Sequence, residues 1–435
     1  SENCSVGGHT MQGANSSGSY NTVVGTLAAT AHTTGSWNTA IGRKSCEDLT
    51  SGSNNAALGS SSLANITTGN ENTAIGSSSL GTLTTGSYNV AVGRISLFAT
   101  TANNNTAVGF ESLKANTTGQ QNVAVGSHSL DANTTASFNT ALGAYSLSSN
   151  ISGTYNTAIG KSALNSNTTA NNNTALGFSA LFANTTGVEN VAVGGNSLDA
   201  NVDGHNCTAV GYNALTNSTS ADYLTGLGAN VTHNYNTAIG AFALQVNTAS
   251  NNVAVGYDSL GSNTTGSHNT AVGREALKNN VDGWNNTAVG TYALKSNTTG
   301  DYNTGLGYYA LHANTTGLDN VGVGKNAGKS TVNGSYNTAV GTNAHNSNVS
   351  GGSNTVLGSY ALDAATSASL SVAIGTEALS AVTTASRNIG IGYRAGSKIT
   401  TGTSNVVIGS EALAQCETGA YNIVMGLYAA YDLTS

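Results

Sequence analysis

The stretch NTALGFSALFANTTGVENVAVGGNSL, residues 173–198, contains nearly the same phrase twice, NTALGFSAL and NVAVGGNSL, with NTTG between them. The glycine at the fifth place of each phrase recurs from Gly25 to Gly426, and neighbouring members are almost always 17 residues apart. Two intervals span 16 residues, and the interval from Gly228 to Gly240 spans 12. A fixed period along a whole chain indicates a solenoid with one supersecondary unit per repeat.

The repeat reads N-T-A-[VI]-G-x-x-[AS]-L-x-x-N-T-T-G-x-x, and its composition favours short strands over helices. NTAVG is a β-branched run, NTTG is a turn, and a two-helix repeat needs more than about 30 residues. We therefore predict an all-β parallel β-solenoid (a β-roll or β-helix) of about 25 coils with a 17-residue repeat. Residues 1–435 are predicted to form a single continuous solenoid, with a shortened, pinched coil at 229–240. At about 4.8 Å per coil, such a rod is roughly 120 Å long.

Composition and charge argue against several classes of partner. The 435 residues include no proline, so every backbone N–H is free to join a ladder of strands. The net charge is -7 and no run of like charge occurs, which argues against nucleic acid or an anionic membrane as the partner. The chain shows no apolar run that would span a membrane and opens with no signal peptide, so we expect no membrane insertion.

The strand of each repeat is apolar on both faces. Thr or Val at the second place and Val or Ile at the fourth share one face, and Ala or Gly at the third place lies on the other. We expect the bulky face, together with leucines such as Leu63 and Leu113, to fill the interior. The small face then points outward and needs a cover, for which another copy of the chain is the simplest candidate. This predicted self-association face comprises Ala107, Ala124, Ala158, Gly305, Gly322 and Gly390.

The phrase NVAVG, at residues 89–93, 122–126 and 190–194, and the phrase SVAIG, at 371–375, resemble the head repeat of YadA-like (Hep/Hag) proteins. That family comprises the heads of trimeric autotransporter adhesins, and similar arrays are found in repeat regions of phage and viral fibres. The resemblance covers essentially the whole chain. It implies a left-handed parallel β-roll, three chains side by side, and display on a cell or virion surface for attachment.

The sequence also departs from the adhesin pattern. Its period is longer, and we see neither a coiled-coil stalk, a membrane anchor nor a self-cleaving chaperone domain. A single-chain solenoid with a three-sided coil therefore stays open beside the trimer.

Asparagine opens the phrase in 22 of the 25 coils. We interpret this column as a structural asparagine ladder, in which each side-chain amide bonds to the next coil. Display of the amides to a sugar is the alternative. The predicted ladder includes Asn21, Asn38, Asn72, Asn89, Asn122, Asn139, Asn156, Asn190, Asn269, Asn303 and Asn337.

A second asparagine opens NTTG, where most copies also read as N-x-T acceptors for glycosylation. Turn propensity alone also explains Asn and Thr at this place. Glycans on every coil, about 4.8 Å apart, would collide. The possible glycosylation sites are Asn116, Asn133, Asn167, Asn184, Asn263, Asn297 and Asn314.

Aromatic residues recur just before the opening asparagine, and others follow the glycine. Two interpretations stay open: ridges that stack on carbohydrate rings or contact a host surface, and rings that cover the corners of the coils. The possible ligand-binding column comprises Tyr88, Tyr155, Tyr302, Tyr336 and Tyr421.

Enzyme signatures fail on inspection, and we predict no enzyme, no catalytic residues, no metal and no cofactor. GKS at 160–162 lacks the upstream glycine of a phosphate-binding loop, and the eight histidines fall on different coils. Cys4 and Cys46 lie about two coils apart, which is too far for an intrachain disulfide. Cys4 and Cys416, near opposite ends, are a possible interchain disulfide.

The sequence thus predicts a non-enzymatic extracellular fibre or adhesin whose main partner is the chain itself. Two assembly routes are open, a lateral trimer and head-to-tail stacking into filaments, the second because a bare coil end presents unpaired strands. A host-surface glycan or a matrix protein is a possible further partner. The alternatives are a carbohydrate-binding spike that uses the aromatic column and, because Thr is expected to face inward, less favourably an ice-binding solenoid.

Overall fold

The computed structural model describes residues 2–13, 16–228 and 234–434, which form an all-β parallel β-solenoid of about 24 turns with a 17-residue repeat. The described residues contain no helix. They divide into two compact units, Ser1–Tyr223 and Leu224–Ser435, and each unit is described by itself. Part of the pinched coil at 229–240 lies outside the described residues. That coil and the single continuous solenoid stay predictions.

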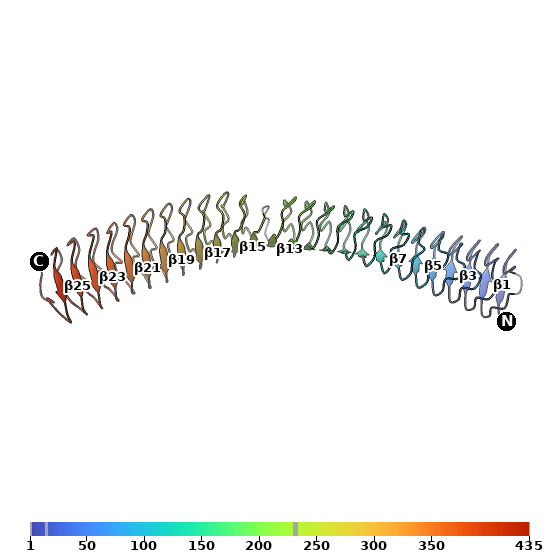
Figure 1. The fold of residues 1–435 in the computed structure, drawn as a ribbon, viewed down its shortest axis with the longest axis horizontal. Helices are drawn as coiled ribbons and strands as arrows, with labels where there is room; N and C mark the ends of the chain where they lie inside the picture. The colour runs from blue at the N-terminus through green and yellow to red at the C-terminus, as the bar shows by residue number, and fades with distance from the viewer. Residues whose placement is uncertain (1, 14–15, 229–233, 435) are drawn as a thin grey trace. The chain divides into compact units, whose positions relative to one another are not determined.

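Every described coil contains one strand of three residues, and within each unit the strands stack side by side, with the connecting loops rising from the same side (Figure 1). In the first unit the strands are β1 (Cys4–Val6), β2 (Thr22–Val24), β3 (Thr39–Ile41), β4 (Ala56–Leu58), β5 (Thr73–Ile75), β6 (Val90–Val92), β7 (Thr106–Val108), β8 (Val123–Val125), β9 (Thr140–Leu142), β10 (Thr157–Ile159), β11 (Thr174–Leu176), β12 (Val191–Val193) and β13 (Thr208–Val210). In the second unit they are β14 (Thr225–Leu227), β15 (Thr237–Ile239), β16 (Val253–Val255), β17 (Thr270–Val272), β18 (Thr287–Val289), β19 (Thr304–Leu306), β20 (Val321–Val323), β21 (Thr338–Val340), β22 (Thr355–Leu357), β23 (Val372–Ile374), β24 (Ile389–Ile391), β25 (Val406–Ile408) and β26 (Ile423–Met425).

Equal positions of successive coils stack in columns. We number the positions of a coil 1 to 17 from the asparagine that opens the phrase, so that the strand occupies positions 2 to 4. Neighbouring strands pair parallel and in register: in β10 and β11, Thr157 pairs with Thr174 and Ile159 with Leu176. Each column therefore repeats one kind of side chain at the strand spacing of about 4.8 Å.

The interior of the coil is filled by the small residue at position 3 and the large one at position 9. Leucines at position 9, such as Leu63 and Leu113, are fully buried, as expected. The predicted orientation of the strand faces, however, is wrong. The small face points into the core and is not a self-association surface: Ala107, Ala124 and Ala158 are 0% exposed, and Gly305, Gly322 and Gly390 are buried.

Volume explains this orientation. A Cβ atom added to Gly305 would lie 3.2 Å from the Cγ of Leu294, which occupies position 9 of the preceding coil. The leucine thus fills the space above position 3, where the following coil carries Ala or Gly, with Val424 in the last coil as the exception. Where position 9 is instead Gly396, the next coil carries the larger Val407 at position 3. The bulky residues at positions 2 and 4 are left on the outside.

The loops hold many side chains in the left-handed region of backbone conformation, at positions 7, 9 and 17. In one coil these are Ser61 (φ 55°), Leu63 (φ 49°) and Glu71 (φ 57°). This conformation costs roughly 1–2 kcal/mol per residue that is not glycine. Hydrogen bonds to both neighbouring coils offset it, because Ser61 N donates back to Arg43 O and Leu63 N donates forward to Ser79 O. A coil is therefore stable only between its neighbours.

Position 5 is restricted to glycine. At Gly59 the backbone φ is +144°, which side-chain-bearing residues rarely adopt, and a Cβ atom would lie 2.6 Å from the carbonyl oxygen of Gly76 in the next coil. The glycine column that reveals the period is thus required by close stacking of the coils.

Candidate interaction surfaces

The outward side of the strands is a solvent-exposed apolar surface. It consists of the side chains at positions 2 and 4 of every strand, which we call the sheet face. Position 4 is Val, Ile, Leu or Met in every described strand, and position 2 is Thr, Val, Ile, Ala or Cys, so the face carries no charge. Large apolar side chains on it that are more than a third exposed are Val6, Leu58, Ile75, Val123, Leu142, Leu176, Val191, Val210, Leu306, Leu357, Ile423 and Met425.

Two parallel columns make up this face within each unit. One holds mostly threonine and valine at position 2, and the other holds only aliphatic side chains at position 4. In-register pairing places position 2 beside position 2 and position 4 beside position 4, as Thr304 pairs with Val321 and Leu306 with Val323. Thirteen strands per unit at about 4.8 Å make a strip roughly 60 Å long. Soluble monomers rarely expose contiguous apolar patches of more than a few hundred Å².

The sequence already contained the signal for this surface, since the column at position 4 is the most regular apolar column in the repeat. From the sequence we expected the side chains of this column to lie inside the coil. The exposed surface that they form was therefore missed. The threonines were assigned inward with this column, and Thr22, Thr39 and Thr338 are instead exposed.

The asparagine column at position 1 forms the predicted ladder. Asn38 Nδ2 donates to Asn21 Oδ1 at 3.1 Å and to the carbonyl oxygen of Gly52 at 2.9 Å, while Asn38 N donates to the same Oδ1. Every asparagine predicted for the ladder is buried and hydrogen-bonded. The ladder satisfies polar groups inside the coil, and the buried amides of these predicted ladder residues are not presented to a ligand.

The asparagines at position 12 form a second ladder, which the sequence reasoning missed. Asn133 Nδ2 donates to Asn116 Oδ1 at 2.8 Å and to Ala136 O at 3.1 Å. The glycosylation prediction is therefore wrong, because all seven proposed sites have side chains that are 0% exposed: Asn116, Asn133, Asn167, Asn184, Asn263, Asn297 and Asn314. Asn201 and Asn280 continue the ladder in the sequence NVD, which keeps the asparagine but lacks the threonine of a glycosylation acceptor. Retention of asparagine without that threonine was the signal in the sequence for a structural role.

The aromatic column at position 17 lies on the surface, next to the sheet face. Tyr88, Tyr155, Tyr302, Tyr336 and Tyr421 are all exposed. Stacking occurs in short runs, as between Tyr20 and Trp37, whose ring centroids are 4.2 Å apart, and between Phe138 and Tyr155 at 4.9 Å. Polar residues interrupt the column elsewhere, at Glu71 and Asp319 for example. Its role in binding a ligand stays a prediction.

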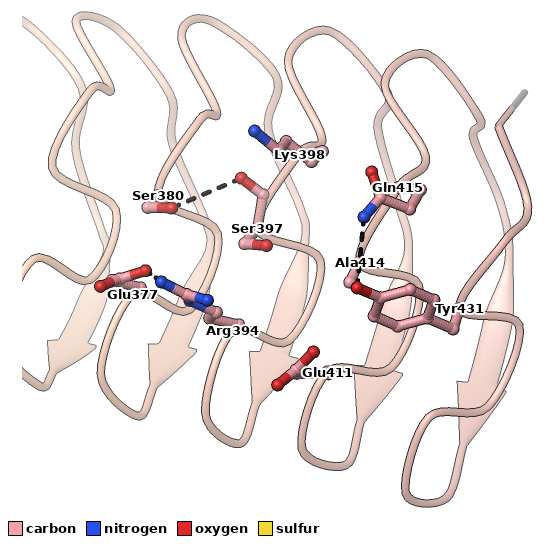
Figure 2. A pocket seen from close by; sticks show the side chains of 9 residues that line it. All are labelled: Glu377, Ser380, Arg394, Ser397, Lys398, Glu411, Ala414, Gln415 and Tyr431. Carbon is pink, nitrogen blue, oxygen red and sulfur yellow. Dashed lines mark hydrogen bonds and ion pairs between the residues drawn. The ribbon is translucent and has the colours of Figure 1, made fainter.

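A polar groove of about 230 Å³ lies on the flank of the last coils of the second unit (Figure 2). It opens where position 10 carries the small residues Ser380, Ser397 and Ala414. Along one wall Arg394 Nε donates to Glu377 Oε2 at 2.7 Å, and Gln415 Nε2 donates to the Tyr431 hydroxyl at 3.4 Å near the end of the groove. The remaining lining residues are Lys398 and Glu411. Acidic and basic groups balance, so the groove does not concentrate one charge.

The cysteines do not fit the predicted interchain disulfide. Cys4 is exposed, but Cys416 is buried, so its Sγ atom lies inside the coil and cannot meet a thiol of another molecule. Cys46 and Cys207 are buried as well, and burial raises the pKa of the Cys46 thiol to about 12.

The described residues hold neither a metal-binding cluster nor a membrane-spanning helix. No group of three His, Cys, Asp or Glu side chains is placed to hold a metal ion, and no helix is of the length and apolarity needed to cross a membrane. Comparison of the chain with family models, curated proteins and solved structures finds no match.

Proposed function

We propose that this chain is a structural rod whose copies associate side by side through the sheet face, as an extracellular fibre for attachment or surface architecture. The uncharged apolar strip that runs along each unit carries the proposal. Self-association was expected from the sequence through the small face, and it is assigned here to the bulky face at positions 2 and 4.

A second copy of the chain is the partner that fits this surface best. The sheet face repeats at every coil, so a partner can cover all of it only if the partner has the same spacing. Another copy meets this condition over its whole length, and its own exposed face is covered at the same time. A parallel arrangement of three chains, as the YadA-like resemblance implies, would place three such faces around one axis.

The energetics of this contact are adequate. Full burial of a Val or Leu contributes about 1.5–3 kcal/mol, so covering the partly exposed side chains at positions 2 and 4 together contributes about 1 kcal/mol per strand. Thirteen strands in one unit then supply on the order of 10 kcal/mol. This is comparable to the roughly 4–15 kcal/mol that association costs in lost freedom, so contact along a whole unit can offset that cost.

The test is the mass of the chain in solution, measured by light scattering after gel filtration at micromolar concentration. The single chain weighs 43.3 kDa, and we expect an integral multiple of this mass, three for the trimer. The variant Leu142→Glu/Leu176→Glu places two carboxylates on the sheet face and is expected to run at 43.3 kDa. Ser152→Glu/Thr186→Glu, on exposed positions of the opposite flank of the same coils, is the matched control and is expected to keep the multiple.

Wild-type protein at 43.3 kDa across the concentration range would overturn lateral association. Equal masses for the two charge variants would show that the sheet face is not the contact. Head-to-tail stacking is the second route, and electron micrographs with filaments of indefinite length would favour it.

A second candidate, ice binding, gains support from one observation. From the sequence, threonine was expected to face inward. The threonines of position 2 in fact face outward, in a column that valine and a few other residues interrupt. A flat array of hydroxyl and methyl groups is what an ordered water layer would match. Thermal hysteresis of the purified chain, lost in Thr157→Lys/Thr174→Lys, would support this function, and an unchanged freezing point would remove it.

A further inference from the structure

A basic and aromatic patch lies on the flank of the second unit, away from the sheet face. It occupies positions 6, 7 and 10 of the three coils that begin with β18, β19 and β20, and it consists of Tyr292, Lys295, Tyr308, Tyr309, Lys325 and Lys329. These three coils carry no acidic residue at those positions. In a chain of net charge -7, this is a local concentration of positive charge.

The aromatic part of the patch is a fixed cluster. The Tyr309 ring lies 4.4 Å from Tyr308 and 5.0 Å from Tyr292, measured between centroids, and 4.7 Å from the ring of His312. Tyr308 stands at right angles to Tyr309 and is 48% exposed. The Tyr308 ring is thus held by its neighbours and has about half of its surface exposed to solvent.

The ammonium groups lie around these rings. Lys295 Nζ lies 4.9 Å from the centre of the Tyr292 ring and Lys329 Nζ lies 5.2 Å from that of Tyr309. Lys295 also bonds to Glu275 at 2.8 Å. Lys325 occupies position 6, as Tyr308 does one coil earlier, and in the part of the chain described neither Lys325 nor Lys329 forms an ion pair. Two ammonium groups in the coil that follows Tyr308 thus have no carboxylate partner among the described residues and can pair with an anionic ligand.

We propose that this patch binds an acidic carbohydrate, a sugar chain that carries carboxylate or sulfate groups. The C–H face of a sugar ring packs against an aromatic ring, for which Tyr308 is placed. The ammonium groups of Lys325 and Lys329 pair with the anionic groups, and the tyrosine hydroxyls and the Asn326 amide bond to sugar hydroxyls. The columns repeat at about 4.8 Å, so a sugar chain laid along the unit meets equivalent positions on successive coils.

The same chemistry distinguishes this ligand from a nucleic acid. Single-stranded nucleic acids are held by bases that stack on aromatic side chains along a positively charged groove. Here the Tyr309 ring is packed against Tyr308, Tyr292 and Lys329, so one ring, Tyr308, is left to stack. This inference does not depend on lateral association, because the patch and the sheet face use different positions of the coil.

The test is titration calorimetry of the full chain with three probes at low salt: a sulfated heparin decasaccharide, an oligogalacturonate of similar length and neutral dextran. We expect binding of the two acidic probes, weakening as salt is added, and none of dextran. Lys325→Gln/Lys329→Gln is expected to weaken binding at least tenfold. Tyr308→Ala is expected to weaken it similarly, and Tyr308→Phe to retain most of it.

The matched control is Lys161→Gln, which removes an exposed lysine at position 6 of a coil in the first unit and is expected to leave affinity unchanged. Circular dichroism of each variant checks that the solenoid is intact. The proposal is overturned if neither acidic probe binds. It is also overturned if Lys161→Gln and Lys325→Gln/Lys329→Gln lose the same amount of affinity. Oligothymidylate that binds more tightly than both sugars would assign the patch to nucleic acid.

Discussion

Leu311 and Gly322 are packed so closely that a Cβ atom on the glycine would lie 2.8 Å from the leucine Cγ. Leu311 is at position 9 of one coil and Gly322 at position 3 of the next, so the pair shows which side of the strand faces the core. We predict that Gly322→Val destabilises the surrounding coils by about 1–3 kcal/mol through overpacking. Hydrogen exchange of the backbone amides in these coils measures this locally.

Two further variants make this prediction specific. Leu311→Ala is expected to recover part of the loss when combined with Gly322→Val, because it makes room for the valine. Ala339→Val introduces the same side chain one coil later, where Gly328 precedes it in place of leucine, and is expected to cost less. Equal losses for Gly322→Val and Ala339→Val would contradict the packing rule.

The ladder at position 1 predicts a large effect for a small substitution. Asn139 Oδ1 accepts from Asn156 N at 3.0 Å, and Asn139 Nδ2 donates to Gly153 O at 2.8 Å. Asn139→Ala leaves Asn156 N buried without this acceptor, at about 1–3 kcal/mol, and removes one of two donors to Gly153 O, which keeps its bond from Asn150 Nδ2 at 3.0 Å. Asn139→Ser is expected to cost less, since Ser371 naturally accepts from Asn388 N through its hydroxyl. Urea midpoints of the two variants measure the difference, and identical values would show that the ladder contributes little.

Burial of three cysteines gives a prediction about thiol chemistry. In the native protein a thiol reagent is expected to label Cys4 alone, and in denaturant to label all four cysteines. Any disulfide-linked dimer on a non-reducing gel must then involve Cys4 and disappear in Cys4→Ser. Rapid native labelling that persists in Cys4→Ser would mean that a coil holding Cys46, Cys207 or Cys416 opens readily.

The period, the fold class and the first asparagine ladder could be predicted from the sequence because each depends on regularity alone. The 17-residue spacing determines that one repeat forms one coil and stacks on the next. Stacking then places the same position of each repeat in one column. The orientation of the strand could not be predicted in this way. Positions 2 and 4 are bulkier and more apolar than position 3, so ordinary patterning assigns them to the core.

That patterning failed because side chains from the loop already fill the interior. Leu311 and its equivalents at position 9 belong to a loop with left-handed backbone conformation (φ 49° at Leu311). A pattern that considers only the strand residues does not include them. The second ladder was missed for a related reason. NTTG reads as an exposed turn, yet its asparagine points inward and bonds to the coil before it, as Asn133 does to Asn116.

We predict that His345 makes the stability of the second unit depend on pH. It occupies position 9, where most coils have leucine, it is fully buried, and neither ring nitrogen has a hydrogen-bond partner among the described residues. Desolvation lowers its pKa from the usual 6.5 to about 4. The apolar residues Ala344, Ala361 and Leu362 occupy neighbouring interior positions, and no charged side chain contributes to the shift.

The sign of the effect follows from this lowered pKa. Below pH 6.5 the unfolded chain binds a proton at His345 and the folded coil does not, so stability is lost as pH falls from about 6.5 to about 4 and is constant above that range. The full loss is about 3 kcal/mol, at 1.36 kcal/mol per pKa unit. Hydrogen exchange of the β21 and β22 coils at several pH values measures it. His345→Leu should remove this dependence, whereas His268→Gln, which alters an exposed histidine, should retain it, and a slope unchanged in His345→Leu would assign the acid sensitivity to another group.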